Sequence, residues 1–441
     1  MRRLALVLVA AVALSGCQGA KSFLGFGSYK KPLPGQRVSV LQLKQSDVAD
    51  PALTDVKVLL PQPFANPDWP QPGGYPSHAM QHLALRETLA VAWSVNVGAG
   101  ATDERPLLGE PIVADGRVYT IDSRSRVSAV DAGSGKEIWR TDLAKGIAKD
   151  KLIGGGLAFD SGKIFVATPF AELVALDARS GKEIWRKSVP GPMRVGPAVS
   201  NGRIFAITID SSLYAFAQDD GRRLWSHSGI AQSAGLLGTT TPAVDGDQVV
   251  VAYSSGEIYG LRIDTGRTLW SENLAGQMRG GAVATLADIR GRPVIDRDHV
   301  IAISHSGTMA ALDSRHGARV WDGNFGGSHS PWVAGEYIFV LSNDQELLCL
   351  TRAEGHVRWV SSLPKYENPA EHKNPILWQG PVLAGDRLIL TATDGKAMSV
   401  SPYTGKLLGE IELPGPTHLP PVVAHGTVYI LSDNADLIAL R

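Results

Sequence analysis

Three features of the 441-residue sequence predict an all-β fold. First, a segment with constant internal spacing recurs from residue 87 to the end of the chain. Second, each copy contains short runs of β-branched and aromatic residues separated by glycine-containing turns, which is the pattern of antiparallel hairpins. Third, the 48 glycines and 27 prolines favour many short elements joined by tight turns. Four short antiparallel strands per copy predict an eight-bladed β-propeller.

Each copy is marked by a turn glycine and by a tryptophan four residues after it. The glycines are Gly135, Gly181, Gly221, Gly266, Gly317, Gly355 and Gly405, and the tryptophans after the first six are Trp139, Trp185, Trp225, Trp270, Trp321 and Trp359. In the seventh copy, Gly409 stands at the tryptophan position. An indole at one fixed position of each blade is the expected packing contact between neighbouring blades. We therefore expect these tryptophans to be structural and not to stack on a ligand.

The copy at the C-terminus is incomplete. Pro421 begins an eighth copy, but the chain ends at Arg441, before a last strand with its tryptophan. Residues 87–97 contain such a strand around Trp93, without the three strands that precede it in other copies. We therefore expect the N-terminal strand to complete the last blade, which would close the ring and remove an exposed sheet edge.

The N-terminus has the pattern of an exported lipoprotein. Residues 1–16 begin with basic residues and continue as an apolar run from Leu4 to Leu14, which is too short to cross a bilayer. The run leads into a Leu-Ser-Gly-Cys motif that ends at Cys17 and resembles the bacterial lipobox. The resemblance implies a signal peptide over 1–16, lipidation of Cys17 with palmitate among its acyl chains, and, with Gln18 following, a place on the periplasmic face of the outer membrane.

Residues 17–86 are expected to form a tether between the lipidated cysteine and the repeats. Prolines are dense between residues 61 and 76, and they forbid a continuous helix or a central strand. We expect the first part to be a flexible spacer, with Trp69 and Tyr75 as candidates for docking onto the globular body. The propeller is then expected to occupy residues 87–441.

Composition and charge exclude several classes of function. The chain has 43 basic and 43 acidic residues and lacks the clustered basic excess of nucleic-acid-binding proteins. Its two cysteines, Cys17 and Cys349, provide neither a disulfide scaffold nor a multi-cysteine zinc site. The 11 histidines form no cluster with ligand spacing, and no nucleophile stands beside a base. We therefore expect no enzymatic activity, no metal and no cofactor.

The strand and turn segments around Gly135 and Gly181 resemble the repeat of pyrroloquinoline-quinone-type (PQQ-type) propellers. Two groups of proteins share this repeat. The quinone-dependent dehydrogenases carry a vicinal cysteine pair, which this chain cannot form from Cys17 and Cys349. A lipobox followed by a bare eight-bladed ring instead resembles the BamB family of outer-membrane assembly lipoproteins.

The BamB resemblance implies a non-enzymatic scaffold. Such a scaffold binds the periplasmic domains of BamA and other subunits of the β-barrel assembly (BAM) complex, and it assists the insertion of unfolded outer-membrane proteins. A PQQ-dependent quinoprotein oxidoreductase and a periplasmic propeller that binds a small ligand remain alternatives, because a fold alone does not determine function.

The connections between each tryptophan and the next copy vary in length and open on one face of the ring, which marks that face for binding. One connection carries Leu236 and Leu237 beside glycines, and the next carries Asp288 and Arg290. In the BamB family the corresponding loops resemble Leu-x-Leu-Arg-Gly and Leu-x-Asp-Val-Asp and contact BamA. Leu236 and Asp288 match these patterns, whereas Leu237 replaces the arginine and Arg290 replaces an aspartate. The resemblance implies that these four residues bind the partner; the alternative for the leucines is that they pin their loop to the ring.

Overall fold

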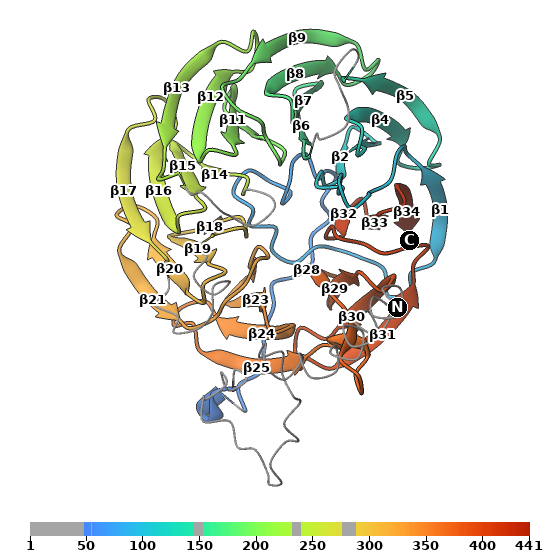
Figure 1. Ribbon diagram of the computed structural model, residues 1–441. Coiled ribbons are helices and arrows are strands. Elements are labelled where there is room, and N and C mark those ends of the chain that lie inside the picture. The colour runs from blue at the N-terminus through green and yellow to red at the C-terminus, as the bar shows by residue number, and fades with distance from the viewer. Residues whose placement is uncertain (1–47, 54, 145–152, 232–239, 276–287) are drawn as a thin grey trace, which may run out of the picture. The chain divides into compact units, whose positions relative to one another are not determined.

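The computed structural model describes residues 48–53, 55–144, 153–231, 240–275 and 288–441. The compact unit Asp47–Arg441 consists of eight four-stranded antiparallel sheets arranged as blades around a central axis (Figure 1). The predicted all-β fold and the number of blades are confirmed. Leu236 and Leu237, as well as Cys17, lie outside the described residues.

The first four blades follow one another along the chain, and each runs from its inner strand at the axis to its outer strand at the rim (Figure 1). Blade 1 contains β2 (Ile112–Ala114), β3 (Arg117–Ile121), β4 (Arg126–Asp131) and β5 (Glu137–Asp142). Blade 2 contains β6 (Gly156–Asp160), β7 (Lys163–Ala167), β8 (Glu172–Asp177) and β9 (Glu183–Ser188). Blade 3 contains β10 (Ala198–Ser200), β11 (Arg203–Thr208), β12 (Ser212–Ala217) and β13 (Arg223–Ser228). Blade 4 contains β14 (Ala243–Asp245), β15 (Gln248–Ala252), β16 (Glu257–Arg262) and β17 (Thr268–Asn273).

The remaining blades repeat the arrangement, with one small insertion. Blade 5 contains β18 (Val294–Asp296), β19 (His299–Ile303), β20 (Met309–Asp313) and β21 (Arg319–Gly323), and blade 6 contains β22 (Trp332–Ala334), β23 (Tyr337–Leu341), β24 (Glu346–Thr351) and β25 (Val357–Ser362). A hairpin of β26 (Tyr366–Asn368) and β27 (Lys373–Pro375) precedes blade 7, which contains β28 (Trp378–Ala384), β29 (Arg387–Ala392), β30 (Lys396–Val400) and β31 (Leu407–Glu412). Blade 8 contains β32 (Val422–Ala424), β33 (Thr427–Leu431), β34 (Asp436–Leu440) and β1 (Val91–Asn96).

The turn chemistry of blade 1 explains its tight hairpins. Asp115 and Gly116, between the first two strands, have φ of 50° and 68°, which is the left-handed pair that a type I′ turn requires. Between the third and fourth strands, the Asp131 carboxylate accepts hydrogen bonds from the backbone N–H (2.8 Å) and the hydroxyl (2.7 Å) of Ser134. These bonds lower the pKa of Asp131 and fix the turn that ends at Gly135.

Neighbouring blades meet through the repeated tryptophan. A Cβ atom on Gly317 of blade 5 would lie only 2.6 Å from the ring of Trp270 in blade 4, so the indole packs directly on the glycine. The Trp270 indole N–H also donates to the carbonyl of Ser314 in the same turn, at 2.9 Å. The glycine therefore has two roles, since it adopts a positive φ of 70° and leaves room for the indole. Trp270 therefore packs between blades 4 and 5, in the kind of contact that the sequence analysis expects of the repeated tryptophans.

The ring is closed by the two ends of the propeller sequence. Strand β1 pairs antiparallel with β34, with Trp93 opposite Ala439, and Ala90 and Arg441 exchange backbone hydrogen bonds of 2.8 and 2.9 Å. Trp93 then reaches blade 1, where its indole N–H donates to the Ala132 carbonyl at 3.2 Å. The predicted completion of the last blade by the N-terminal strand is confirmed.

A segment from Phe64 to Leu85, which we call the central segment, crosses the middle of the ring in blue in Figure 1. The inner strand of each blade has one edge without a neighbouring strand, and its backbone groups require other partners. The central segment provides a hydrogen-bond partner at every blade in turn, through Asn66 at blade 8, Trp69 at blade 1, Pro70 at blade 2, Gln71 at blade 3, Pro76 at blade 4, Ser77 at blade 5, Gln81 at blade 6 and Leu83 at blade 7.

The central segment changes the expected boundary of the propeller. Asn66, Gln71, Met80 and Leu83 are all buried, and the Trp69 ring stacks on Trp332 at a centroid distance of 6.2 Å. Residues 64–85 of the expected tether therefore lie within the ring, whereas Asp50 contacts the outer strand β25 through its hydrogen bond to Val357. The boundary expected at residues 86 and 87 does not coincide with that of the compact unit, which begins at Asp47.

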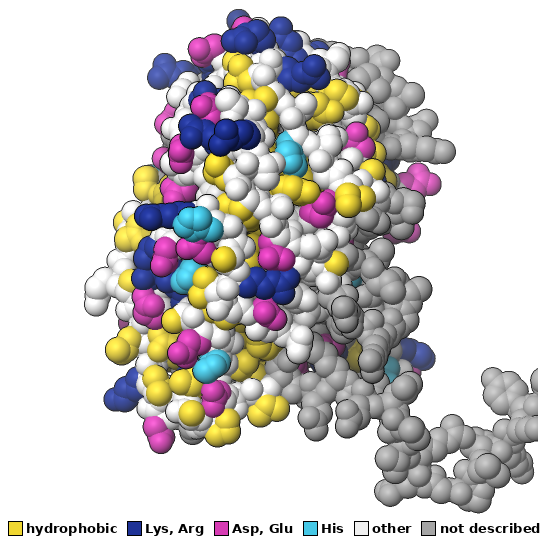
Figure 2. All heavy atoms as spheres, turned by 90° about the vertical axis from the view of Figure 1, so that its left-hand side faces the viewer, with side chains coloured by type: hydrophobic (Ala, Val, Ile, Leu, Met, Phe, Trp, Pro, Cys, Tyr) yellow, Lys and Arg dark blue, Asp and Glu magenta, His cyan; other side chains and the backbone are white. Residues whose placement is uncertain are grey.

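The surface of the described chain has mixed charge on the side that Figure 2 shows. On the rim formed by β13, β17 and β21, basic and acidic side chains are interspersed and do not gather by sign. The described residues contain one short 3-10 helix, η2 (Pro51–Leu53). No helix in this part of the chain has the length and apolar character of a membrane span.

Candidate functional site

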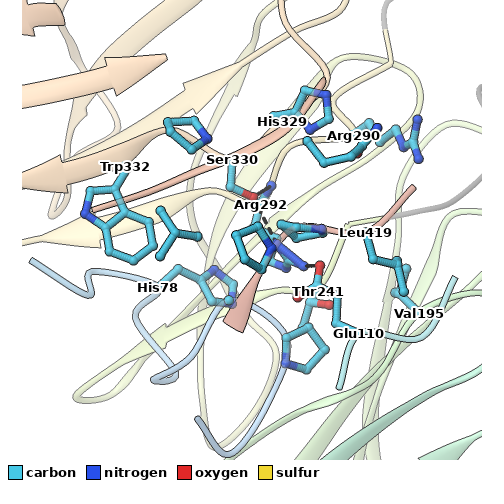
Figure 3. A pocket seen from close by; sticks show the side chains of 18 of the residues that line it. His78, Glu110, Val195, Thr241, Arg290, Arg292, His329, Ser330, Trp332 and Leu419 are labelled. Carbon is cyan, nitrogen blue, oxygen red and sulfur yellow. Dashed lines mark hydrogen bonds and ion pairs between the residues drawn. The ribbon is translucent and has the colours of Figure 1, made fainter. Parts of the chain in front are cut away.

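A hollow lies at the mouth of the central channel, where the connections between blades lead into the inner strands (Figure 3). Its volume is about 130 Å³. Residues immediately before the inner strands form its wall, including Glu110, Thr241, Arg290, Arg292, Ser330 and Leu419. The central segment forms its floor through Trp69, Pro72, Gly73 and His78. Since blades that are not neighbours in the ring meet only at the axis, closure of the ring creates this site.

Arg292 lies between two polar partners in the hollow, as the dashed lines in Figure 3 show. Its guanidinium pairs with the Glu110 carboxylate and donates to the Ser330 hydroxyl, to which it lies at 3.2 Å. Desolvation lowers the pKa of Arg292 to about 10, which leaves the group protonated at neutral pH. The pair joins blade 5 to blade 1 across the channel.

Two histidines of the hollow are neutral at neutral pH. The Nδ1 of His78 lies 2.8 Å from the Pro293 carbonyl, and since a carbonyl only accepts, Nδ1 carries the proton. Burial and the nearby Arg292 lower the pKa of His78 to about 3. Burial, followed by Arg290 and Arg292, lowers the pKa of His329 to about 3 as well. With both histidines neutral, two arginines and one glutamate contribute a formal charge of +1 to the lining, which also contains His418, whose pKa its hydrogen bond with Asp433 raises.

Arg290 and Asp288, which the sequence analysis assigned to a partner-binding loop, have different environments. Arg290 lines the hollow, where desolvation lowers its pKa and the charge of Asp288 raises it. Asp288 is only 3% exposed, and its backbone carbonyl accepts a hydrogen bond of 2.9 Å from the His305 N–H. The side chain of Asp288 is therefore buried, and its assignment to partner binding stays a prediction. The charge of the Asp288 carboxylate raises the pKa of Arg290, and Arg290 is the member of the pair that lines the hollow.

Sequence reasoning missed Arg292, His78, His329 and Glu110. Arg292 stands directly before Pro293, the repeat proline that precedes the inner strand of blade 5, so a search at the residues preceding the repeat prolines finds it. His78 gave no such signal, because its position depends on the path of the central segment through the ring.

The repeated tryptophans do not line this hollow. Trp139, Trp270, Trp321 and Trp359 are buried in the contacts between blades, and Trp93, Trp185 and Trp225 occupy the same position with partial exposure. None of these seven is among the residues of the wall or floor, to which the indoles of Trp69 and Trp332 contribute instead.

The donor set of the hollow does not fit a calcium and quinone centre. Calcium takes six to eight oxygen ligands, often carboxylates, whereas Glu110 is the one carboxylate of the lining and is paired with Arg292. The described residues contain no group of three or more His, Cys, Asp or Glu that could hold a metal ion. Cys349 lies in the buried strand β24, where burial raises the pKa of its thiol and disfavours the reactive thiolate.

The fold and the repeated glycine and tryptophan contacts define a β-propeller of the PQQ-like repeat class. The family model described as outer membrane protein assembly factor BamB matches residues 123–361. The chain therefore belongs to the family of outer membrane protein assembly factor BamB.

Similar proteins agree with this family. The assembly factor BamB of Shewanella oneidensis is 24% identical over 77% of this chain and 86% of its own length. The crystal structure of BamB from Moraxella catarrhalis covers 80% of this chain and 100% of its own, with 19% identity and a TM-score of 0.69. The quinohemoprotein alcohol dehydrogenase of Comamonas testosteroni covers 85% of this chain and 80% of its own, with 16% identity and a TM-score of 0.63. At these identities, the structural matches show a shared fold.

Proposed function

We propose that this chain is a non-enzymatic lipoprotein scaffold of the BAM complex, which binds BamA and assists the insertion of outer-membrane β-barrel proteins. The observation that carries the proposal is the BamB family match over residues 123–361. The structure adds a rigid ring whose variable connections surround the mouth of the channel, a suitable platform for recognition loops. Unfolded outer-membrane proteins are the further partners in this proposal.

The membrane anchor is part of the same proposal. Residues 1–16 act as a signal peptide, Cys17 is lipidated, and the chain is held at the periplasmic face of the outer membrane. One acyl chain binds a membrane only marginally, whereas several chains hold it firmly.

The partner-binding site is proposed at the connections that carry Leu236, Leu237, Asp288 and Arg290. The position of Arg290 at the wall of the hollow supports a role in recognition, because an arginine offers five donors in a fixed geometry. Asp288 contributes by favouring the charged form of Arg290.

The experiment is gentle affinity purification of the tagged, full-length chain from membranes, with Cys17→Ala as the matched variant. We expect BamA to co-purify with the unaltered chain and the variant to leave the membrane fraction under a high-salt wash. A bound quinone chromophore in place of BamA would contradict the proposed scaffold. Retention of Cys17→Ala in the outer membrane would contradict only the proposed lipid anchor and would leave the proposed scaffold role standing.

A further inference from the structure

One boundary between blades differs from the other seven. In those seven, the indole of one blade packs on the turn glycine of the next, from Trp93 on Gly135 around the ring to Trp359 on Gly405. Six of the seven indole N–H groups also donate to a carbonyl of the next blade, and Trp185 is the exception. Each of these boundaries is therefore filled by an aromatic side chain of fixed position.

The eighth boundary, between blades 7 and 8, lacks both halves of this contact. Gly409 of β31 stands at the tryptophan position, and a Cβ atom there would meet no atom within 4 Å. Blade 8 has no turn between its third strand, β34, and its outer strand, because β1 from the other end of the propeller sequence provides the outer strand. The split blade that closes the ring thus removes the glycine on which an indole would pack.

The strands beneath Gly409 nevertheless retain the shape that accommodates an indole. In every blade the residue paired with the tryptophan position on the third strand is small, namely Ala129, Ala175, Ala215, Gly260, Ala311, Cys349, Ser399 and Ala439. The next residue inward is large and apolar, and at blade 7 it is Ile389. Ser399 and Ile389 therefore repeat the pair found under the indoles of the other blades, with a small residue on the third strand and a large apolar residue on the second.

A hollow of about 390 Å³ occupies this boundary, which lies on the right-hand side of Figure 1. This volume is within the roughly 300–1,000 Å³ of typical ligand pockets. Its apolar lining comes from Leu89, Ile389, Leu408, Ile411, Val428 and Leu440. Leu407 and Leu408 are 57% and 58% exposed, and β31 is the one outer strand of the described blades whose residues are all exposed.

The polar residues around this hollow are predominantly acidic. Glu87, Asp386 and Glu410 line it together with one basic side chain, Arg387, so the formal charge of the lining is −2. The outer edge of β31 also has no neighbouring strand, and its backbone groups can pair with an added strand. The shape of the hollow, the negative charge of its lining and the free edge of β31 together favour an extended peptide segment with an aromatic side chain and basic residues.

We propose that the boundary between blades 7 and 8 is a docking site for an extended segment of another protein, which inserts a large aromatic side chain flanked by basic residues. The segment adds a strand along β31, and its aromatic ring takes the place that an indole fills at the other seven boundaries. This site is separate from the channel mouth, so its failure would leave the proposed scaffold role intact.

The test uses the purified full-length chain and a fluorescein-labelled peptide of sequence Lys-Thr-Val-Trp-Val-Thr-Lys, with alanine replacing tryptophan in a control peptide. Fluorescence anisotropy measures the dissociation constant at low salt. We expect the tryptophan peptide to bind at least 10-fold more tightly than the alanine peptide, because a tenfold ratio corresponds to about 1.4 kcal/mol and burial of a large apolar side chain supplies that much. Equal binding of the two peptides, or no binding, would overturn the proposal.

Gly409→Trp is the decisive variant, because it fills the hollow with the chain's own indole. We expect it to raise the melting temperature and to weaken peptide binding at least 10-fold, while Gly409→Ala retains binding. Leu408→Glu, at an exposed position, should also abolish binding and keeps the test valid if the tryptophan variant fails to fold. Full binding by folded Gly409→Trp or by Leu408→Glu would refute the site.

Two other occupants give distinct results. If deletion of residues 18–46 is required before the peptide binds, the chain's own N-terminal segment fills the hollow and the proposed partner is wrong. If sedimentation velocity shows a dimer that Leu408→Glu dissociates, a second copy of the chain is the occupant, which also contradicts the proposal.

Discussion

Trp69 and Val113 exchange both of their backbone hydrogen bonds, at 2.7 and 2.9 Å, although one belongs to the central segment and the other to the inner strand of blade 1. The Trp69 indole also stacks on Trp332 of blade 6. Blades 1 and 6 are therefore joined through a residue that precedes the first repeat. The proline-rich central segment stabilises the ring from within.

Replacing Trp69 by alanine should strongly destabilise the ring. Trp69 is only 3% exposed, and truncation of a buried tryptophan costs about 3–5 kcal/mol. The matched control is Leu59→Ala, which lies just before the central segment and is 75% exposed. Urea unfolding should show a large loss for the first variant and little change for the second. Equal stabilities would mean that the central segment does not support the ring.

The repeat explains how much of this fold could be predicted. The spacing from Gly135 to Trp139 recurs along the chain and gives the blades, their number and the closure by Trp93. The path of the central segment could not be predicted in this way, because Asn66 and Leu83 find their partners in blades 8 and 7, hundreds of residues away. Such contacts leave no periodic signal in the sequence.

A comparison of Trp225 with Trp185 measures how much the indole hydrogen bond contributes to the free energy of unfolding. Both pack in a tilted geometry on a phenylalanine of their own blade, at centroid distances of 5.8 and 6.0 Å. Of the two, only Trp225 donates its N–H, to the Ile263 carbonyl at 3.0 Å. Trp225→Phe should therefore cost about 1 kcal/mol more than Trp185→Phe, since it alone removes a hydrogen bond. Chemical denaturation of the two variants checks this difference. A larger loss for Trp185→Phe would show that packing outweighs the hydrogen bond.

The neutral histidines of the channel mouth predict a loss of stability in acid. His78 and His329 have pKa values lowered to about 3, so between pH 6.5 and 3 the unfolded chain binds protons that the folded chain does not. Stability therefore falls as the pH drops below 6.5, by up to roughly 2 kcal/mol per histidine at pH 5. Arg290, Arg292 and Glu110 face these rings from the neighbouring elements.

His78→Asn isolates this effect, because an asparagine amide can still donate to the Pro293 carbonyl but does not titrate. The difference in unfolding free energy between pH 7 and pH 5 should be smaller in this variant than in the unaltered chain. His418 acts in the opposite direction, since Asp433 raises its pKa and its contribution is lost as the pH rises. An unchanged pH dependence in His78→Asn would contradict the assignment.

The candidate site was only partly predictable from the sequence. Loop position identified Arg290, which does line the hollow, but the burial of Asp288 depends on the packing of its connection against the His305 turn. Arg292 and Glu110 come from blades 5 and 1 and meet only when the ring is closed. A sequence pattern along one connection cannot show which residues of the other blades will face it across the axis.

The most direct test of the proposed scaffold role is the dissociation constant of the BamA periplasmic domains for the full-length chain and for two matched variants. Arg290→Gln removes the charge at the channel mouth, and Lys182→Gln removes an exposed charge on the turn of Gly181, on the opposite face of the ring. We expect tight binding by the unaltered chain and by Lys182→Gln, and binding at least 10-fold weaker for Arg290→Gln, as befits loss of a central interface residue. No binding by the unaltered chain, or weakening by Lys182→Gln alone, would contradict the account.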